Sequence, residues 1–213
     1  RTNKSPACTG STNGSRLPID RELVAELLGF KGLVVHTRDA MWQSDGPIEL
    51  MSAAQAILCN IDRLAEDLQI WATSEFNFID LSESHSRISV IMPQKKNPYS
   101  LAYTRGVARE MIGRLSATAA LQMTPSGQVD NRIFTYGMVP KGLKQTKEAL
   151  KLFSVTISGL KVNKDKMLLA AVESLGGATD LAEEIMMRHG INAQAAHSIV
   201  AQAIRFSTQE GQR

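Results

Sequence analysis

A long run of apolar residues at helical spacing, from about Pro47 to about Phe76, is the strongest constraint on the fold of this chain. Its apolar positions recur at the spacing of one helix face; they are Ile48, Met51, Ile57, Leu58, Ile61, Leu64, Leu68 and Trp71. A helix of this extent is on the order of 40 Å long at a rise of 1.5 Å per residue. Helices of that length in globular proteins usually belong to bundles or to the cores of oligomers. The pattern therefore predicts a bundle of long helices.

Further helices are expected along the rest of the chain, and no alternating apolar pattern predicts a strand of any length. Two are long, from roughly Tyr99 to Met123 and from roughly Val139 to Leu160. Three are short and are separated by glycines; they span 163–175, 179–189, where Thr179 is the expected N-cap, and 193–206. The sequence thus predicts an all-α fold. We expect part of a central helical-bundle domain over 1–161, with a loop at 82–98, and then a small helical C-terminal domain over 162–213.

Composition and charge exclude several classes of function. The chain has 213 residues, of which 43% are hydrophobic and 21% charged, as in ordinary globular proteins. Its net charge of +3, without a basic cluster, does not indicate nucleic-acid binding. It has no apolar run of membrane-spanning length and no signal peptide, and Cys8 and Cys59 show neither metal-ligand spacing nor a disulfide framework. We therefore expect a soluble, cytoplasmic protein with no cofactor, no metal and neither nucleic acid nor membrane as a partner.

The segment 82–98 is the part of the chain best suited to chemistry. It is rich in serine, lies between two predicted long helices and ends in Met92-Pro-Gln-Lys-Lys-Asn-Pro98. Loops held by rigid elements are where binding groups tend to lie. A lysine here could pair with a carboxylate, and Asn97 can both donate and accept hydrogen bonds. Ser89 could act as an acid or a base only if cations and backbone N–H groups lower the pKa of its hydroxyl; composition alone also allows a solvated basic turn.

Several motifs, in the right order, resemble the fumarase/aspartase superfamily and most closely argininosuccinate lyase. The segment from Ser89 to Pro98 matches the superfamily signature Ser-x-x-Met-Pro-x-Lys-x-Asn-Pro. The segments 5–6, 18–22 and 25–30 together resemble a second signature. The resemblance extends through the long central helix at 62–79 and the C-terminal segments 178–182 and 196–197. Because it covers nearly the whole chain, it is more specific than a lone motif.

The resemblance implies a role for three residues of the loop. Ser89 would be the catalytic base, taking a proton from the carbon next to a substrate carboxylate. Lys95 would bind the substrate and stabilise the extra negative charge on that carboxylate. Asn97 would hydrogen-bond the same substrate, and closure of the loop would exclude water. The carbon–nitrogen bond would then break, and fumarate and an amine would leave.

Departures from the argininosuccinate lyase pattern point to a different amine. Ile88 and Val90 replace a glycine and a second serine of the usual loop, and Ala102 stands where that family has a glutamate. The stretch 128–136 also differs from the family's Tyr-Asn-x-Asp-x-Gln-Glu-Asp-Lys segment. Its Asn131 and Arg132 are expected to bind substrate, Arg132 by gripping a second carboxylate bidentately; the alternative is a surface arginine at a helix start. The predicted substrate is therefore an N-substituted aspartate related to argininosuccinate rather than argininosuccinate itself.

The resemblance also implies an assembly larger than one chain. Members of the superfamily are homotetramers whose active sites are each built from three subunits, and their acid-side histidine lies in an N-terminal region that has no counterpart in these residues. We therefore expect a fragment of a longer protein, a homotetramer with shared active sites, and little activity from these 213 residues alone. The four histidines are expected to be ordinary structural or surface residues, and among them only His85, four residues before Ser89, could lie near the site.

Two other interpretations stay open at the level of sequence. One is a non-catalytic, crystallin-like structural homologue, which Ala102 and the altered loop favour and the retained Ser89, Lys95 and Asn97 oppose. The other is a sibling enzyme of the superfamily, such as an adenylosuccinate lyase or a cycloisomerase.

Overall fold

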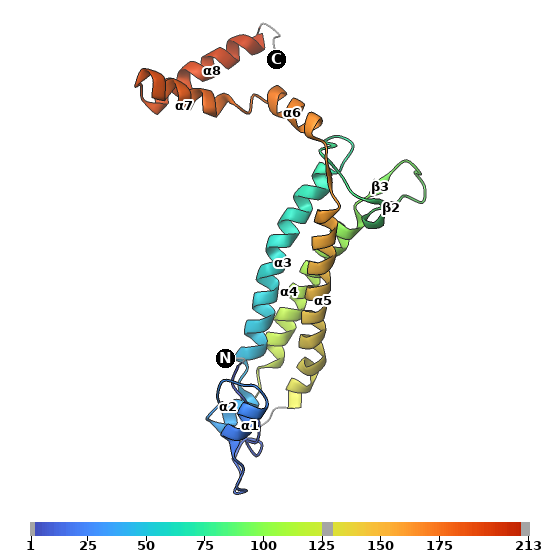
Figure 1. Ribbon diagram of the computed structural model, residues 1–213, viewed down its shortest axis with the longest axis vertical. Coiled ribbons are helices and arrows are strands. Elements are labelled where there is room, and N and C mark those ends of the chain that lie inside the picture. The colour runs from blue at the N-terminus through green and yellow to red at the C-terminus, as the bar shows by residue number, and fades with distance from the viewer. Residues whose placement is uncertain (1–2, 125–129, 210–213) are drawn as a thin grey trace. The chain divides into compact units, whose positions relative to one another are not determined.

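The computed structural model describes residues 3–124 and 130–209, and it is built largely of helices (Figure 1). The long ones are α3 (Asp45–Trp71), α4 (Tyr99–Leu121) and α5 (Ile133–Ser158). The all-α prediction is confirmed. In the described ranges, no helix combines the length and the apolar character that crossing a membrane requires. The cytoplasmic location stays a prediction.

Short elements connect and follow the long helices. The short helices are α1 (Arg21–Leu27), α2 (Thr37–Trp42), α6 (Lys164–Glu173), α7 (Ala178–His189) and α8 (Ala193–Gln209), and the 3-10 turns are η1 (Glu83–His85) and η2 (Asp130–Arg132). Two antiparallel pairs of very short strands join β1 (Ile79–Asp80) to β4 (Lys161–Val162) and β2 (Arg87–Ile88) to β3 (Lys96–Asn97). No sequence pattern predicted these strands or α2.

Contacts divide the chain into two compact units. The first, the bundle unit, consists of Arg1–Ile70 and Leu81–Gly159, and the second consists of Trp71–Asp80 and Leu160–Arg213. In the second unit, β1 pairs with β4, and the Asn163 N–H donates to the Phe78 carbonyl at 2.9 Å. The predicted division into two domains at 161/162 stays a prediction.

The end of α3 differs from the sequence prediction. The helix ends at Trp71 rather than near Phe76, and Asn77 adopts a left-handed backbone with φ of 49°. Phe78 turns back, so that its N–H donates to the Trp71 carbonyl at 2.9 Å and its ring packs edge-on against those of Trp71 and Phe76. The aromatic residues that seemed to continue the helical pattern therefore belong to a turn with its own small cluster.

Two other boundaries also depart from the predictions. Helix α5 begins at Ile133, well before Val139, and accommodates Pro140 in its interior. Proline is normally unfavourable there because it lacks an N–H and crowds the preceding turn. Thr179 lies inside α7 and is not its N-cap; Gly177 holds that position without a side-chain hydrogen bond.

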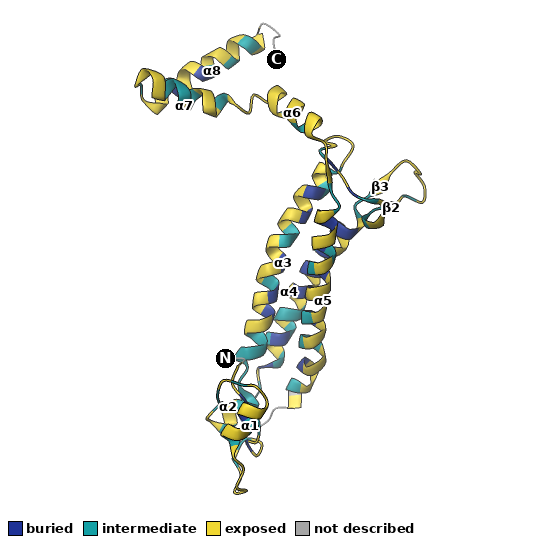
Figure 2. Ribbon diagram, viewed as in Figure 1, coloured by how far each residue is buried: buried dark blue, intermediate teal, exposed yellow. Residues whose placement is uncertain are grey.

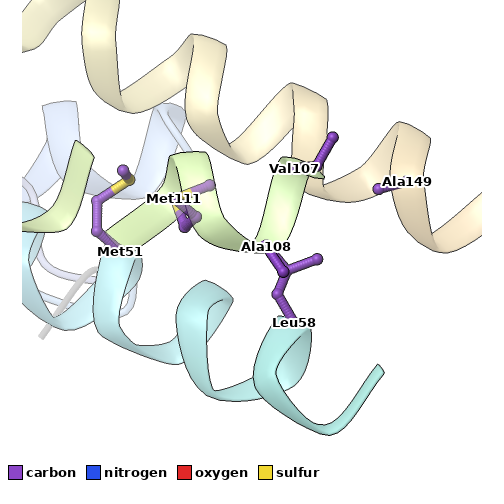
Figure 3. Packing of buried hydrophobic residues seen from close by; sticks show 6 residues of the cluster. All are labelled: Met51, Leu58, Val107, Ala108, Met111 and Ala149. Carbon is purple, nitrogen blue, oxygen red and sulfur yellow. The ribbon is translucent and has the colours of Figure 1, made fainter. Parts of the chain in front are cut away.

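The core of the bundle unit lies where α3, α4 and α5 face one another. Its buried residues are Met51 and Leu58 of α3, Val107, Ala108 and Met111 of α4, and Ala149 of α5 (Figure 3). Small residues let α5 approach closely: a Cβ atom at Gly142 would lie 3.0 Å from Cε of Met51. Figure 2 shows this buried strip running along the inner sides of the long helices, whose outer sides are largely exposed.

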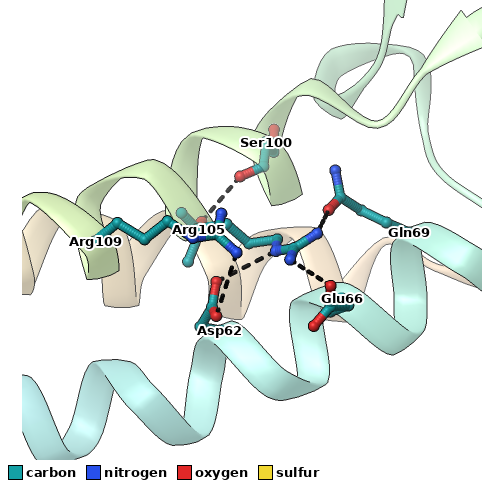
Figure 4. A network of polar contacts seen from close by, with 7 residues as sticks. Asp62, Glu66, Gln69, Ser100, Arg105 and Arg109 are labelled. Carbon is teal, nitrogen blue, oxygen red and sulfur yellow. Dashed lines mark hydrogen bonds and ion pairs between the residues drawn. The ribbon is translucent and has the colours of Figure 1, made fainter.

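A polar network centred on Arg105 of α4 joins that helix to α3 (Figure 4). Its guanidinium donates to Asp62 at 3.2 Å, to Glu66 at 2.6 Å and to Gln69 at 2.5 Å. The Arg105 side chain is only 16% exposed, whereas Arg109, whose guanidinium lies 3.7 Å from Asp62, is 58% exposed. Charged pairs hold geometry best when several groups form a network, as they do here.

On α4, a second ion pair connects to α5. The Arg114 guanidinium donates to the Glu110 carboxylate at 2.6 Å, and the Gln145 amide of α5 donates to the same carboxylate at 3.4 Å. The hydrogen bond from Arg114, more than any other contact, holds the pKa of Glu110 below its ordinary value. This link favours the ionised carboxylate in the folded state.

The Arg105 network predicts unequal effects of two similar substitutions. Arg105→Met should lower the free energy of unfolding by about 1–2 kcal/mol, because it leaves Asp62 and Gln69 without their shared donor. The matched variant Arg109→Met should change it by about 0.5 kcal/mol or less, as expected of an exposed ion pair. Urea unfolding of both variants is the measurement. Equal losses would show that the network contributes no more than an ordinary surface pair.

Candidate functional site

The loop predicted at 82–98 contains a β-hairpin formed by β2 and β3. Strand β2 pairs with β3 so that Arg87 lies opposite Asn97 and Ile88 opposite Lys96. The pairing continues one step further, since the Ser89 N–H donates to the Lys95 carbonyl at 3.0 Å. Pro98 follows directly and α4 begins one residue later. The hairpin is therefore attached at its base to the start of a long helix, which gives it a rigid support.

The hydroxyl of Ser89 accepts hydrogen bonds from the backbone of the hairpin tip. The Met92 N–H donates to Ser89 Oγ at 3.1 Å, and the Ile91 N–H donates to it at 3.4 Å. The Lys95 N–H in turn donates to the Met92 carbonyl at 2.9 Å, which closes the turn. Backbone N–H groups directed at an oxygen stabilise its negatively charged form. The hairpin thus supplies the donors that a serine alkoxide needs.

Strand register places Ser89, Lys95 and Asn97 on one face of the hairpin. Residues directly opposite each other share a face, as do residues two apart on a strand. Ser89 lies opposite Lys95, and Asn97 is two positions beyond Lys95. Within the described ranges, Lys95 has no carboxylate partner and Asn97 no side-chain hydrogen bond, so both polar groups are available to a ligand. Arg87, two positions before Ser89, is a fourth member of this face, which we call the Ser89 face (Arg87, Ser89, Lys95 and Asn97).

Arg87 was not among the site residues predicted from the sequence. Its charge and its position two residues before the signature serine were visible in the sequence. The signal was lost because β2 is too short to show an alternating pattern. Only the pairing with Asn97 shows which residues stand beside Ser89.

His85 anchors the base of the hairpin to both helices beneath it. Its Nδ1 lies 3.2 Å from Oγ of Ser100, near the start of α4, and 3.3 Å from Oγ1 of Thr156, near the end of α5. Both hydroxyls are buried. Thr156 already donates its hydroxyl hydrogen to the Leu152 carbonyl, so it accepts from His85 Nδ1. His85 therefore lies at the base of the hairpin, and its contacts hold the hairpin in place.

The two other predicted substrate-binding residues lie elsewhere in the bundle unit. Arg132 precedes α5, at the end opposite the hairpin, and its guanidinium donates to the carbonyls of Met41 and Gln43. Its buried Nε atom has no hydrogen-bond partner among the residues that the structure describes. The structure thus does not bring Arg132 together with Ser89 in one chain. The Asn131 side chain lies outside the described residues, so its role stays a prediction.

The second signature segment lies at the same end as Arg132. Arg21 of α1 donates to the carbonyls of Ala7 at 3.2 Å and Val34 at 2.8 Å, and this fixes the segment against the chain that leads to α2. Trp42 of α2 donates through its indole N–H to Thr124, just beyond the end of α4, at 3.1 Å. With 26 residues in α5, the bundle separates this end from the hairpin by about 35–40 Å at 1.5 Å per residue (Figure 1).

Possible metal ligands do not gather in the part of the chain that the structure describes. There, no group of three or more His, Cys, Asp or Glu residues is arranged to hold an ion. Ala102, at the position of the argininosuccinate lyase glutamate, is exposed on α4, and its methyl group offers no acceptor. The Ser89 face thus places a hydroxyl that accepts two backbone N–H groups beside two cations and an amide.

Comparison with known proteins identifies the family. A family model described as "Lyase" matches residues 1–113. The chain is 35% identical over 208 residues to an argininosuccinate lyase of Citrifermentans bemidjiense, covering 97% of this chain and 45% of the relative. An argininosuccinate lyase of Bordetella pertussis is 36% identical over 216 residues, which are 99% of this chain and 45% of that protein.

Solved structures agree with this assignment. A crystal structure of EDDS lyase in complex with formate superposes with a TM-score of 0.87 at 29% identity, over 98% of this chain and 42% of that chain. A class II fumarase from Schistosoma mansoni shares the fold, with a TM-score of 0.69 at 15% identity over 86% of this chain and 39% of that one. The chain belongs to this lyase family, which places it in the fumarase/aspartase superfamily. It resembles argininosuccinate lyases and spans less than half the length of the curated relatives it matches.

The hairpin geometry makes a prediction about backbone protection. Ser89→Ala removes the acceptor of the Met92 N–H, so exchange of that amide hydrogen should be roughly fivefold faster, the effect of losing about 1 kcal/mol. Hydrogen exchange followed by NMR measures it. Ser86→Ala is the matched control, because the Ser86 hydroxyl donates to the Ser82 carbonyl outside the tip. Unchanged protection of Met92 in Ser89→Ala would contradict the hydrogen-bonding described for Ser89.

Proposed function

We propose that this chain supplies the proton-abstracting half of a carbon–nitrogen lyase, which cleaves an N-substituted aspartate by β-elimination and releases fumarate and an amine. The observation that carries the proposal is that Ser89 Oγ accepts two backbone N–H groups on the hairpin face that also bears Lys95 and Asn97. Its family membership supports the same reaction class. A small-molecule substrate with carboxylate groups is the ligand that fits these residues.

The reaction begins at the carbon next to a substrate carboxylate. Ser89, as the alkoxide, takes a proton from that carbon and becomes a neutral hydroxyl, while the electron pair of the C–H bond moves into the carboxylate. The resulting aci-carboxylate carries one additional negative charge. Lys95 stabilises that charge through its ammonium group and Asn97 through its amide donor. The electrons then return to form the carbon–carbon double bond as the carbon–nitrogen bond breaks, and the amine leaves with a proton from an acid outside this face.

The tip of the hairpin has a surface suited to closing over a substrate. Val90 is 91% exposed and Ile91 is 89% exposed, although both are large and apolar. Closure against the rest of an assembled site would bury these side chains and would exclude water from the reacting atoms. An enclosed site strengthens the interaction of Lys95 with the developing charge, because the local dielectric falls.

The position of the signature segments supports sites shared between subunits. The hairpin lies at one end of the bundle unit, and the second signature segment and Arg132 lie at the other. Residues separated by the length of a long helix cannot contact one substrate in a single chain. A homotetramer in which different subunits contribute the two ends to one site resolves this separation.

The outer side of α3 supports such an assembly. Leu50, Ile57 and Leu64 are seven residues apart, which places them on one helix face, and they remain 38–47% exposed. This stripe lies beside the buried stripe of Met51, Leu58 and Ala65. A helix that is apolar on two adjacent faces is suited to packing against a second set of helices. The proposed tetramer core would cover it.

The amine part of the substrate is expected to differ from that of argininosuccinate. Ala102 cannot accept a hydrogen bond where argininosuccinate lyases have a glutamate. Structures named EDDS lyase, one of them a variant with bound fumarate, superpose on this chain with TM-scores of 0.87 and 0.81. These observations support an N-substituted aspartate other than argininosuccinate.

Turnover of a Ser89 variant tests the catalytic assignment. A full-length chain that contains these residues should release fumarate, followed by its absorbance, from at least one N-substituted aspartate. Ser89→Ala should lower kcat by roughly 100-fold or more, the range expected for loss of a general base. Ser86→Ala should keep full activity. Unchanged turnover in Ser89→Ala would contradict the assignment of Ser89 as the base. If no N-substituted aspartate yields fumarate, the result would favour a non-catalytic homologue.

Activity should also depend on chain length. The 213 residues alone should show little turnover compared with a full-length chain, because parts of each shared site would be missing. Steady-state kinetics at equal subunit concentration, together with sedimentation to establish the oligomeric state, make the comparison. Comparable rates for the two would show that these residues already contain a complete site.

A further inference from the structure

The guanidinium of Arg87 has no role in the proposed chemistry, yet it lies on the same hairpin face. We propose that Arg87 is a substrate-binding residue that recognises a second carboxylate of the substrate, distinct from the one held by Lys95 and Asn97. The inference rests on the proposed function, since it assigns the substrate class of the same site. It predicts a substrate with at least two carboxylates that lie along the hairpin.

The register of the hairpin places Arg87 beside the reacting groups. Arg87 lies directly opposite Asn97, so the two side chains share a face. It is two residues before Ser89, which separates the two Cα atoms by roughly 7 Å along the strand. That separation lets the long side chains of Arg87 and Lys95 reach different points on a ligand. It is suitable for holding two carboxylates of one small molecule.

Among the residues that the structure describes, Arg87 has no acidic partner, in contrast to three arginines of the helices. Arg105, Arg114 and Arg188 each donate to a glutamate. In the described part of the chain, the contact of Arg87 is with an aromatic ring instead: its guanidinium carbon lies 6.0 Å from the ring centroid of Tyr99. A cation without a carboxylate beside it is available to an anionic ligand.

The contact with Tyr99 holds the Arg87 guanidinium over an aromatic ring at the start of α4. Tyr99 is the first residue of α4 and stands two positions after Asn97. A cation over an aromatic face is held there by the ring quadrupole, while the hydrogen-bonding edge of the guanidinium remains available. That edge presents two parallel N–H groups, which match the two oxygens of a carboxylate. Tyr99 is therefore a positioning residue for Arg87.

Binding of simple carboxylates to the full-length chain tests the assignment. Succinate is the dicarboxylate probe and butyrate the matched monocarboxylate, and isothermal titration measures both. Arg87→Met should weaken succinate binding about tenfold, the equivalent of one charge-assisted hydrogen-bonded contact. The affinity of Arg87→Met for butyrate should stay within about twofold of that of the unmodified chain. The succinate affinity of Arg87→Lys should lie between those of Arg87→Met and the unmodified chain, because lysine keeps the charge but loses the bidentate geometry.

Lys96→Met is the control for charge. This substitution also removes one positive charge from the hairpin. Lys96 lies opposite Ile88, in the pair next to Arg87 and Asn97, so its side chain is on the opposite face of the hairpin. Succinate binding in Lys96→Met should therefore stay within about twofold of the unmodified chain. Circular dichroism and thermal melting of every variant should match the unmodified chain, because Arg87 and Lys96 are both exposed.

The outcomes separate this inference from the proposed function. Equal weakening by Arg87→Met and Lys96→Met, or unchanged succinate binding in Arg87→Met, would overturn the role of Arg87 while leaving the lyase assignment intact. Lys95→Met should weaken both succinate and butyrate, and failure of the unmodified chain to bind either would overturn both proposals. In turnover with the true substrate, Arg87→Met should raise KM about tenfold with kcat nearly unchanged, the signature of lost uniform binding.

Discussion

Close packing of α4 against α3 and α5 is the constraint on which the rest of the bundle unit depends. Gly142 and Ala149 bring α5 near the methionines of the core, and Arg105 fixes α4 against α3. This packing places the start of α4 beside the end of α5. His85 can then reach Ser100 and Thr156 at once, and that contact gives the hairpin a fixed base. The geometry around Ser89 is thus a consequence of how the helices pack.

The same packing also divides the functional residues. Because the long helices run the full length of the bundle unit, the hairpin and the second signature segment lie at opposite ends. Within one chain, Ser89, Lys95 and Asn97 therefore lie at one end, and Arg132 lies at the other. An apolar stripe on the outer side of α3 is the surface that could bring further chains close enough to combine the two. Under the proposed function, activity would therefore depend on assembly of several chains.

The structure was most predictable from the sequence where apolar periodicity alone decides it. The long helices and the overall class follow from apolar spacing, since a continuous apolar face must be buried. Boundaries were less predictable. The ring of Phe78 packs against those of Phe76 and Trp71 in the turn that follows α3. Helix α5 continues through Pro140, although proline normally destabilises a helix interior. The capping role expected of Thr179 was wrong because α7 already begins at Ala178, with Gly177 as its N-cap.

The sequence by itself determined the identity and spacing of Ser89, Lys95 and Asn97, and with them the family. It did so because those residues lie in one short segment whose order is specific. Only the tertiary structure decided what stands beside them. Arg87 joins the face through cross-strand pairing, and Arg132 is directed to backbone carbonyls at the far end of the bundle. Such neighbours depend on register and helix packing between segments distant in the chain, and no local pattern of residues encodes them.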